Sequence, residues 1–228
     1  MNEQRCWICG APADSAEHMV KASDLRSVFG KVTQSAPLYR NSKEERNLPV
    51  RGIDAAPVKF KPSICQTCNN ARTQPYDRAW EALSAAALSH EPPLERGMQV
   101  PIAEVFGSEA DAAMLRIHLY FVKLLGCYAV EYGVPLPINT FAVAILGGHA
   151  HPNVFLSFVY ESSNLGKNQV QVGNISAINV GQATVGATWF YIIGTFGVLV
   201  TYSEHGRPEK EGKPVWHPDD GNTNILML

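Results

Sequence analysis

Four of the five cysteines in this chain form two pairs with the same spacing. Two residues separate Cys6 from Cys9, and two separate Cys65 from Cys68. A C-x-x-C turn presents two thiolates to one ion, and two such turns complete a tetrahedral zinc site with four sulfur ligands. Because the protein then fills every coordination position, this zinc would be structural and would staple the ends of the segment 10–64. The alternatives are unliganded thiols or a redox pair.

Side chains that could perform acid–base and metal chemistry stand next to these pairs. Glu17-His18 lies between the pairs, and Asn69 follows Cys68 directly. Phosphodiester hydrolysis needs a base for the attacking water and a cation that stabilises the developing charge. A neutral imidazole can take the proton, and carboxylate and amide oxygens are ligands suited to Mg²⁺. If zinc gathers the two segments, Glu17, His18 and Asn69 can converge on a second, open cation site.

This arrangement resembles the zinc-containing HNH endonucleases (ββα-metal or His-Me finger family) of the endonuclease-seven type. The resemblance covers about residues 4–80: C-x-x-C, an acidic residue followed by His, and a second C-x-x-C followed by Asn. It implies that His18 is the general base and that Glu17 and Asn69 bind a catalytic Mg²⁺ or Mn²⁺. It also implies a ββα-metal fold for this part and nucleic acid as substrate, with DNA favoured over RNA.

The chain departs from the family pattern at three points. Glu17 replaces the commoner Asp, and Asn69 stands where the family often has His. The middle asparagine, which helps to hold the catalytic histidine, has no assigned counterpart, because Asn41 and Asn47 lie far upstream of Cys65. These departures concern rate and metal preference more than fold.

Positive side chains accompany the predicted site. Arg72 is expected near the scissile phosphate, where a planar guanidinium can clamp two oxygens; the alternative is an exposed arginine in a first helical turn. Lys59 and Lys61 share one face of an extended segment and are candidate backbone contacts, or else part of a solvated strand edge.

The charge is divided unevenly along the chain. The sequence carries 19 Lys+Arg and 21 Asp+Glu, a net charge of −2. Residues 1–80 hold 12 Lys+Arg and 8 Asp+Glu, a net charge of +4. Residues 81–228 hold the remaining 7 Lys+Arg (19−12) and 13 Asp+Glu (21−8), a net charge of −6. A phosphate-facing surface is therefore expected in the first part, with a chance imbalance of solvated charges as the alternative.

Several other candidates have an ordinary structural interpretation beside the functional one. Asn69 or Asn70 could be a helix N-cap, a role compatible with metal binding at Asn69. Cys127 stands in an apolar helical stretch and is expected to be a small buried side chain. His149 and His151 could be metal ligands, but a loop between two strands explains that segment.

Two helices are predicted in the middle of the chain. The first begins near Pro75 and ends at the break Glu91-Pro92-Pro93. The second begins at Ser108, with a hydroxyl and acidic groups in its first turn. Its interior, from Met114 through Cys127, is apolar on most faces and is expected to lie in the core.

Beyond Pro137, segments rich in β-branched and aromatic residues alternate with turn signals, which predicts a mostly antiparallel sheet. The predicted strands are Thr140–Leu146, Val154–Tyr160, Gln169–Val172, Ala187–Ile193 and Val198–Tyr202. The tail from Glu204 to Leu228 is expected to be irregular.

The fold class predicted from these patterns is α+β. A zinc-stapled ββα-metal nuclease module is expected in residues 1–91, followed in residues 92–228 by an α+β domain for substrate recognition, dimerisation or partner binding. The longest apolar stretch, around 115–130, is interrupted by Arg116, His118 and Lys123, and the N-terminus has no apolar signal core. We therefore expect a cytoplasmic protein without a membrane partner, and a homodimer through the C-terminal region is one expectation.

The predicted function is a metal-dependent HNH endonuclease that hydrolyses DNA. The alternative is a zinc-binding scaffold without catalysis, in which the same cysteine pairs support an interaction with DNA or protein. A pure scaffold has no need for an acid, a base and an amide at positions 17, 18 and 69. A third possibility is an HNH-like toxin or effector domain, which no secretion segment in the sequence favours.

Overall fold

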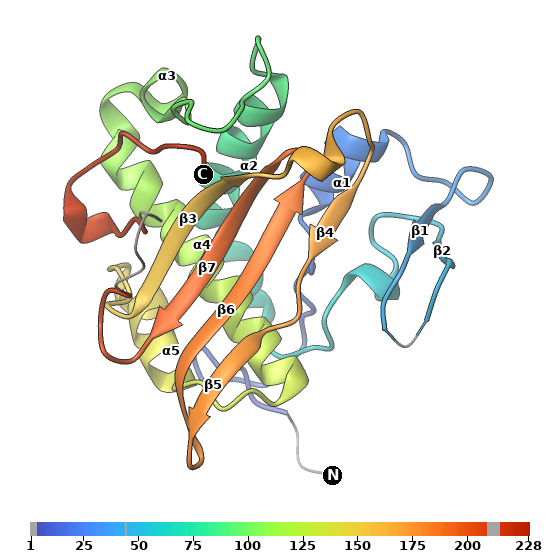
Figure 1. Cartoon of the computed structure of the whole chain (residues 1–228). Helices are drawn as coiled ribbons and strands as arrows, with labels where there is room; N and C mark the ends of the chain where they lie inside the picture. Colours follow the sequence, from blue (N-terminus) through green and yellow to red (C-terminus); the bar gives the residue numbers. More distant parts are fainter. Residues whose placement is uncertain (1–3, 44, 209–214) are drawn as a thin grey trace.

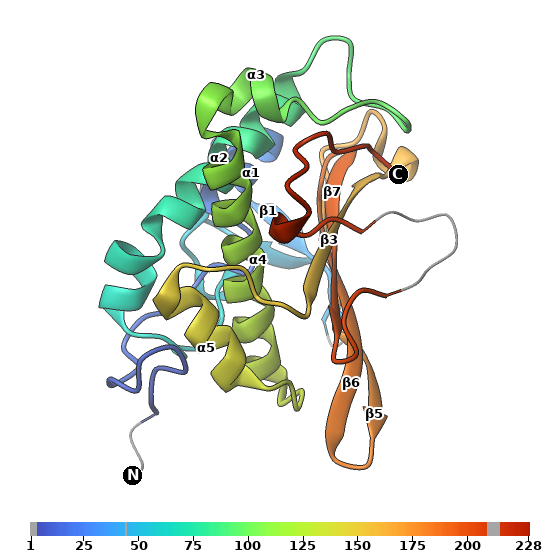
Figure 2. The ribbon, with the colours of Figure 1, turned by 90° about the vertical axis from the view of Figure 1, so that its left-hand side faces the viewer.

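The computed structural model describes residues 4–43, 45–208 and 215–228. Helices pack against one face of a five-stranded antiparallel sheet (Figures 1 and 2). The helices are α1 (Ala22–Phe29), α2 (Gln74–Ser89), α3 (Ile102–Phe106), α4 (Ala110–Tyr132) and α5 (Ile138–Gly147). The strands are β1 (Leu38–Arg40), β2 (Leu48–Val50), β3 (Val154–Tyr160), β4 (Val170–Val172), β5 (Ser176–Val180), β6 (Ala183–Ile193) and β7 (Phe196–Ser203). The prediction of a mixed helix and sheet fold with antiparallel pairing is confirmed.

The large sheet has the strand order β3-β7-β6-β4, and β5 also pairs with β6. Its helix-facing side carries large apolar side chains in register: Leu156 lies opposite Val200, and Val200 lies opposite Trp189. All three are almost fully buried. The richness of these strands in β-branched and aromatic residues, between turn signals, explains why they were predictable. Within this sheet, β5 is the strand that the sequence patterns did not indicate.

α4 is the central helix of the core. The helical run Ile102–Tyr132, which ends with α4, is long and apolar enough to cross a membrane by length and composition, yet 83% of its most apolar window is buried inside the protein. Trp80 of α2 packs against Tyr120 and Phe121 of α4 and against Tyr191 of β6. These contacts tie the helical layer to the sheet, and the predicted core helix is confirmed.

The predicted strand Thr140–Leu146 is wrong, because this segment is the helix α5. Its β-branched and aromatic residues favour a strand locally. In the fold, however, Phe141, Ala144 and Ile145 share a helical face that is buried in the core. Tertiary packing therefore overrides local propensity here.

The start of the long helix also differs from the prediction. Residues 102–106 form the separate short helix α3, and Ser108 lies in a 3₁₀ turn between α3 and α4. No side chain caps α4 at its first turn. The prediction that the helix begins at Ser108 is wrong by two residues.

The N-terminal part brings two extended segments together ahead of α2. Short antiparallel pairings join Ser15 to Ile64 and His18 to Lys59. The β1–β2 hairpin lies between these segments in sequence. Trp7 packs on Gly126 of α4, and one hydrophobic cluster runs from the cysteine pairs to the sheet. The division into residues 1–91 and 92–228 stays a prediction, although the two parts share this core.

Candidate metal centre and the polar site beside it

The sulfur atoms of the four paired cysteines lie within 4.8 Å of one another. The Sγ atoms of Cys9 and Cys65 are 3.6 Å apart. Two thiolates on a tetrahedral zinc are about 3.8 Å apart, given a Zn–S bond of about 2.3 Å. The four cysteines are unoxidised, and Cys9 is the exposed member of the group. The donor set and its spacing therefore fit a four-coordinate metal ion, as the sequence predicts.

Backbone hydrogen bonds shape the first cysteine turn. Cys6 receives the N–H of Gly10 on its carbonyl oxygen at 2.8 Å, and its own N–H donates to the carbonyl oxygen of Ala11 at 2.7 Å. Gly10 has a φ of 78°, a left-handed conformation that glycine adopts without steric cost. The N–H of Trp7 donates to the carbonyl oxygen of Ser63, which links this turn to the segment before Cys65.

The thiols of the cluster differ in their acidity. A hydrogen bond from the backbone of Ala11 lowers the pKa of Cys9 to about 7. Burial raises the pKa of Cys6 and of Cys68, so these thiols resist ionisation in the absence of a positive charge. Arg72 donates a hydrogen bond from a guanidinium nitrogen to the Cys68 sulfur at 2.9 Å. Arg72 thus contacts the metal-binding cluster.

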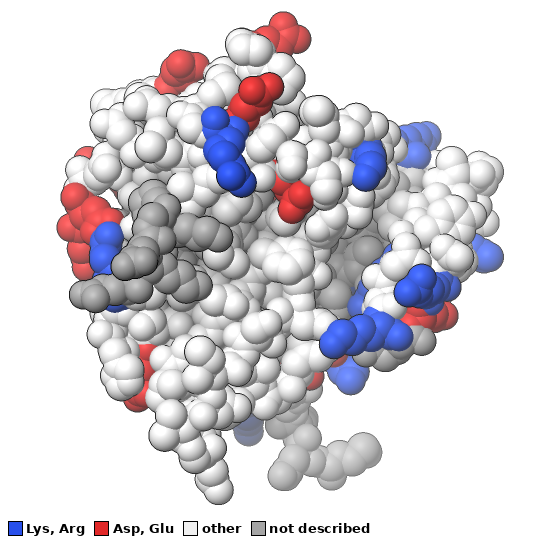
Figure 3. All heavy atoms as spheres, in the orientation of Figure 1, with Lys and Arg blue, Asp and Glu red and all other residues white. Residues whose placement is uncertain are grey.

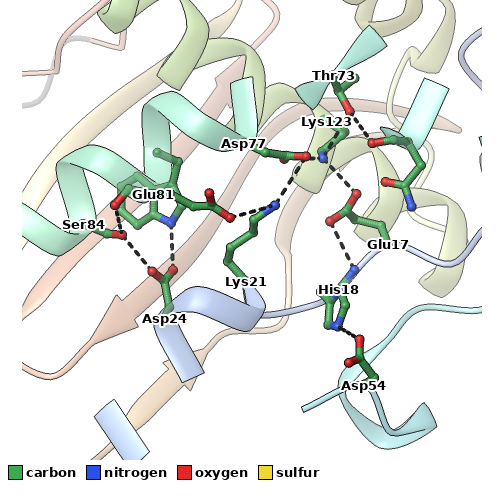
Figure 4. Close-up of polar contacts among 12 residues, drawn as sticks. Glu17, His18, Lys21, Asp24, Asp54, Thr73, Asp77, Glu81, Ser84 and Lys123 are labelled. Atoms are coloured by element: carbon green, nitrogen blue, oxygen red, sulfur yellow. Dashed lines mark hydrogen bonds and ion pairs between the residues drawn. The ribbon is translucent and has the colours of Figure 1, made fainter. Parts of the chain in front are cut away.

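Glu17 lies beside this cluster but faces the protein interior. Only 4% of the residue is exposed. Its Oε2 accepts a hydrogen bond from the Nζ of Lys123 at 2.8 Å, and its Oε1 accepts one from the backbone N–H of His18 at 3.2 Å (Figure 4). Both carboxylate oxygens therefore already have partners within the protein.

Lys123 is the unexpected member of the site. Its side chain is fully buried, and its Nζ donates to Glu17, to the Oδ1 of Asp77 at 2.7 Å and to the Oγ1 of Thr73 at 3.4 Å. Burial on its own would lower the pKa of Lys123, but the charges of Glu17 and Asp77 raise it above the usual value. The lysine is therefore held as an ammonium ion between two carboxylates.

The alternation of charge continues on the other side of Asp77. The Nζ of Lys21 lies 3.4 Å from the Oδ2 of Asp77 and 3.4 Å from the Oε1 of Glu81. Glu17, Lys123, Asp77, Lys21 and Glu81 thus form one chain of opposite charges through the helical layer (Figure 4). Each buried charge in this chain has a partner, as burial requires.

His18 points away from the Glu17 carboxylate (Figure 4). Its Nε2 lies 3.2 Å from the carbonyl oxygen of Ile53 and 3.3 Å from the Oδ1 of Asp54. Because a carbonyl oxygen only accepts, the Nε2 carries the proton and the Nδ1 keeps its lone pair. Burial, followed by the charge of Lys59, lowers the pKa of His18, so the imidazole is neutral at neutral pH.

Asn69 has a partner of its own. Its Nδ2 donates to the Oγ of Ser15 at 2.9 Å, and its backbone N–H donates to the carbonyl oxygen of Cys65 at 2.9 Å. The structure therefore gathers the four cysteines and pairs Glu17 with the backbone of His18. It gives the side chains of Glu17, His18 and Asn69 three separate sets of partners.

The two histidines considered as extra ligands lie between α5 and β3. His151 is buried, its Nε2 lies 2.8 Å from the Oγ1 of Thr140, and its backbone N–H donates to the Nε2 of His118. His149 contacts the carbonyl oxygen of Ala150. Cys127 is fully buried, as predicted. Within the described part of the chain, the four paired cysteines are the group placed to hold a metal ion.

Positive side chains gather around the β1–β2 hairpin (Figure 3). We define this basic surface by six residues that are exposed or half-buried: Arg40, Lys43, Arg46, Arg51, Lys59 and Lys61. Tyr39 of β1, an aromatic residue with 61% exposure, lies among them in sequence. The described acidic residues of the same stretch are Glu45 and Asp54, and Asp54 pairs with Lys59. Lys61 pairs with Glu131 of α4, so two of the six cations already have acidic partners and the basic surface still keeps a positive balance.

Comparison of the chain with protein-family models, with curated proteins and with solved structures finds no match.

Proposed function

We propose that this protein is a zinc-organised nucleic-acid-binding module that binds its partner without cleaving it. Of the functions considered from the sequence, the scaffold has the strongest support in the geometry. The observation that carries this choice is the ammonium group of Lys123, fully buried between the carboxylates of Glu17 and Asp77 at 2.8 and 2.7 Å.

A catalytic divalent cation needs ligand oxygens that are free and positions that water and phosphate can reach. Glu17 is buried and its oxygens are paired. A divalent ion about 4 Å from the ammonium would meet a repulsion of roughly 8 kcal/mol at an effective dielectric constant of about 20. Lys123 therefore takes the electrostatic role that the expected cation would have at Glu17.

The basic surface supports the binding half of the proposal. Six Lys and Arg side chains on one projecting hairpin and its flanks suit a polyphosphate backbone, and Tyr39 can stack on an unpaired base. A zinc ion on the four cysteines would hold this surface in place, because segment 10–64 enters and leaves through the two cysteine turns. Zinc would thus act on binding through the fold.

The test measures binding and cleavage on the same samples of the zinc-loaded full chain. Fluorescence anisotropy with labelled DNA and RNA should show binding that weakens as salt is added. The slope of the logarithm of the association constant against log[salt] should be no steeper than about −5, which is the limit for six phosphate contacts. Arg46→Glu with Arg51→Glu should weaken binding at least tenfold. Arg96→Glu, at an exposed arginine outside the basic surface, is the matched control.

Two results would overturn the proposal. One is the absence of salt-dependent binding to any nucleic acid. The other is cleavage of plasmid, single-stranded or branched DNA that requires Mg²⁺ or Mn²⁺ and disappears in His18→Ala.

The second result would establish the other candidate, a metal-dependent HNH endonuclease. One observation favours it: the Nε2–H of His18 is held by Ile53, which leaves a neutral Nδ1 available as a base. In this candidate Glu17 and Asn69 bind Mg²⁺ or Mn²⁺ after Lys123 has left Glu17, and Arg72 contacts the phosphate. His18→Ala would then abolish cleavage while the zinc content stays unchanged.

A further inference from the structure

The two edges of the large sheet differ in how the chain covers them. At the β3 edge, Leu156 and Trp216 exchange two backbone hydrogen bonds of 2.9 and 2.7 Å. Leu228 adds two more, to Phe158 and Tyr160, each 3.0 Å long. The C-terminal segment therefore satisfies the backbone groups of this edge.

β5 lies at the opposite edge and has no such cover among the described residues, where its pairing is with β6. Figures 1 and 2 show β5 and the adjoining part of β6 extending beyond the helical layer. In an edge strand, about half of the backbone N–H and C=O groups point away from the sheet and can pair with another strand.

The sequence of β5 lacks the charged and proline residues that usually protect such an edge. Ser176–Val180 contains no charged residue, proline or glycine. All five residues are exposed, and Ile178 and Val180 are exposed by 68% and 66%. The one protective feature is a register shift on β6 between Ile178 and Asn179, which leaves the edge uncharged. An exposed, uncharged, apolar edge strand is a template for strand addition.

We propose that the free edge of β5 pairs with the β5 strand of a second copy of this chain, in antiparallel orientation about a two-fold axis. Ile178 is the middle residue of β5, so it would lie opposite Ile178 of the partner subunit. About a two-fold axis a strand pairs with its own copy, so a charged residue would come close to a residue of the same charge. Such like-charge pairs destabilise a sheet. β5 is neutral, and so are all the residues of β3, β4, β6 and β7.

Self-pairing also suits the outer face of the sheet. Phe190 of β6 points to this face and remains 37% exposed, and Ile178 lies on the same face through its pairing with Gly186. Joining two sheets at β5 makes one continuous sheet and brings both copies of these side chains together. The inference is independent of nucleic-acid binding, and it assigns the surface for a homodimer.

The test is sedimentation equilibrium of the zinc-loaded full chain over a range of concentrations. We expect a monomer–dimer equilibrium, and Ile178→Lys should raise the dimer Kd at least tenfold because two ammonium groups then face each other across the axis. Leu165→Lys is the matched control, since Leu165 is exposed by 65% and lies in the loop before β4. Far-ultraviolet circular dichroism and zinc content should match wild type in both variants.

A second variant tests whether Ile178 of the two subunits lie opposite each other in the dimer. Ile178→Cys should form an intermolecular disulfide under mild oxidation, because side chains directly opposite in an antiparallel pair lie about 5 Å apart. Leu165→Cys and wild type should not. A chain that stays monomeric at all concentrations overturns the inference. So does a dimer that Ile178→Lys leaves intact and Ile178→Cys does not cross-link.

Discussion

Replacing Lys123 by methionine removes the charge between Glu17 and Asp77 while keeping a side chain of similar length. In the wild type the ammonium lies 2.8 Å from the Glu17 carboxylate and 2.7 Å from that of Asp77. Without it, the two carboxylates remain buried and lose their shared partner. Breaking a buried ion pair by removing one partner costs about 3–5 kcal/mol, because the remaining charge is uncompensated. We expect Lys123→Met to lower the free energy of unfolding by about this amount at pH 7.

Urea denaturation followed by tryptophan fluorescence measures this change. The triple variant Lys123→Met, Glu17→Gln, Asp77→Asn removes all three charges and should recover most of the lost stability. Arg78→Met is the matched control, because Arg78 is an exposed cation next to Asp77 in sequence; it should change stability by less than about 0.5 kcal/mol.

The same variant tests the idea that the lysine replaces a divalent ion. With the ammonium gone, Glu17, Asp77 and Thr73 present oxygen ligands in one place. Mn²⁺ at about 100 times its Kd would stabilise Lys123→Met by about 2.7 kcal/mol and leave wild type unchanged. A loss below about 1 kcal/mol in Lys123→Met, or equal stabilisation of both proteins by Mn²⁺, would refute the reasoning.

Three further predictions concern the zinc, the packing and the pH dependence. Cys65→Ser should lose zinc and folded structure together, measured by elemental analysis and circular dichroism; a well-folded, zinc-free variant would contradict the staple. Gly126→Ala should destabilise the protein by about 1–3 kcal/mol, because its new Cβ would lie 2.6 Å from the Trp7 ring; an unchanged urea midpoint would contradict this packing. Stability should fall below pH 6.5, because burial lowers the pKa of His151 to about 4, so the unfolded chain binds a proton that the folded chain does not. The loss of stability from His151 reaches about 3 kcal/mol near pH 4. Burial also lowers the pKa of His118, which adds to the loss. An unfolding free energy that stays constant between pH 7 and 4 would contradict this prediction.

The features that could be predicted from the sequence are those with a local signal. The spacing within the two cysteine pairs is a short-range pattern, and the structure brings the four sulfurs together. The apolar run from Met114 to Cys127 also has a local cause, because a helix that is apolar on most faces must lie in a core. Thr140–Leu146 shows the limit, since its propensity favours a strand while burial of one helical face decides the outcome.

The environment of Glu17 could not be predicted in this way. Its partner Lys123 is 106 positions away in the sequence, and only the packing of α4 beside the cysteine turns brings the two together. One signal was present: Lys123 is a charged residue inside a long apolar helix, and such a residue has to be paired when the helix is buried. The signal indicates that a carboxylate partner exists, but it does not identify which one.

Counting the metal ions held by the intact protein tests the central claim most directly. The zinc-loaded full chain would be dialysed to equilibrium against Mn²⁺, and both metals would be measured inside and outside the membrane. We expect one zinc ion for each chain and no manganese above the outer solution, because Lys123 neutralises the carboxylates that a second cation would need. Stoichiometric manganese that disappears in Glu17→Gln would contradict it.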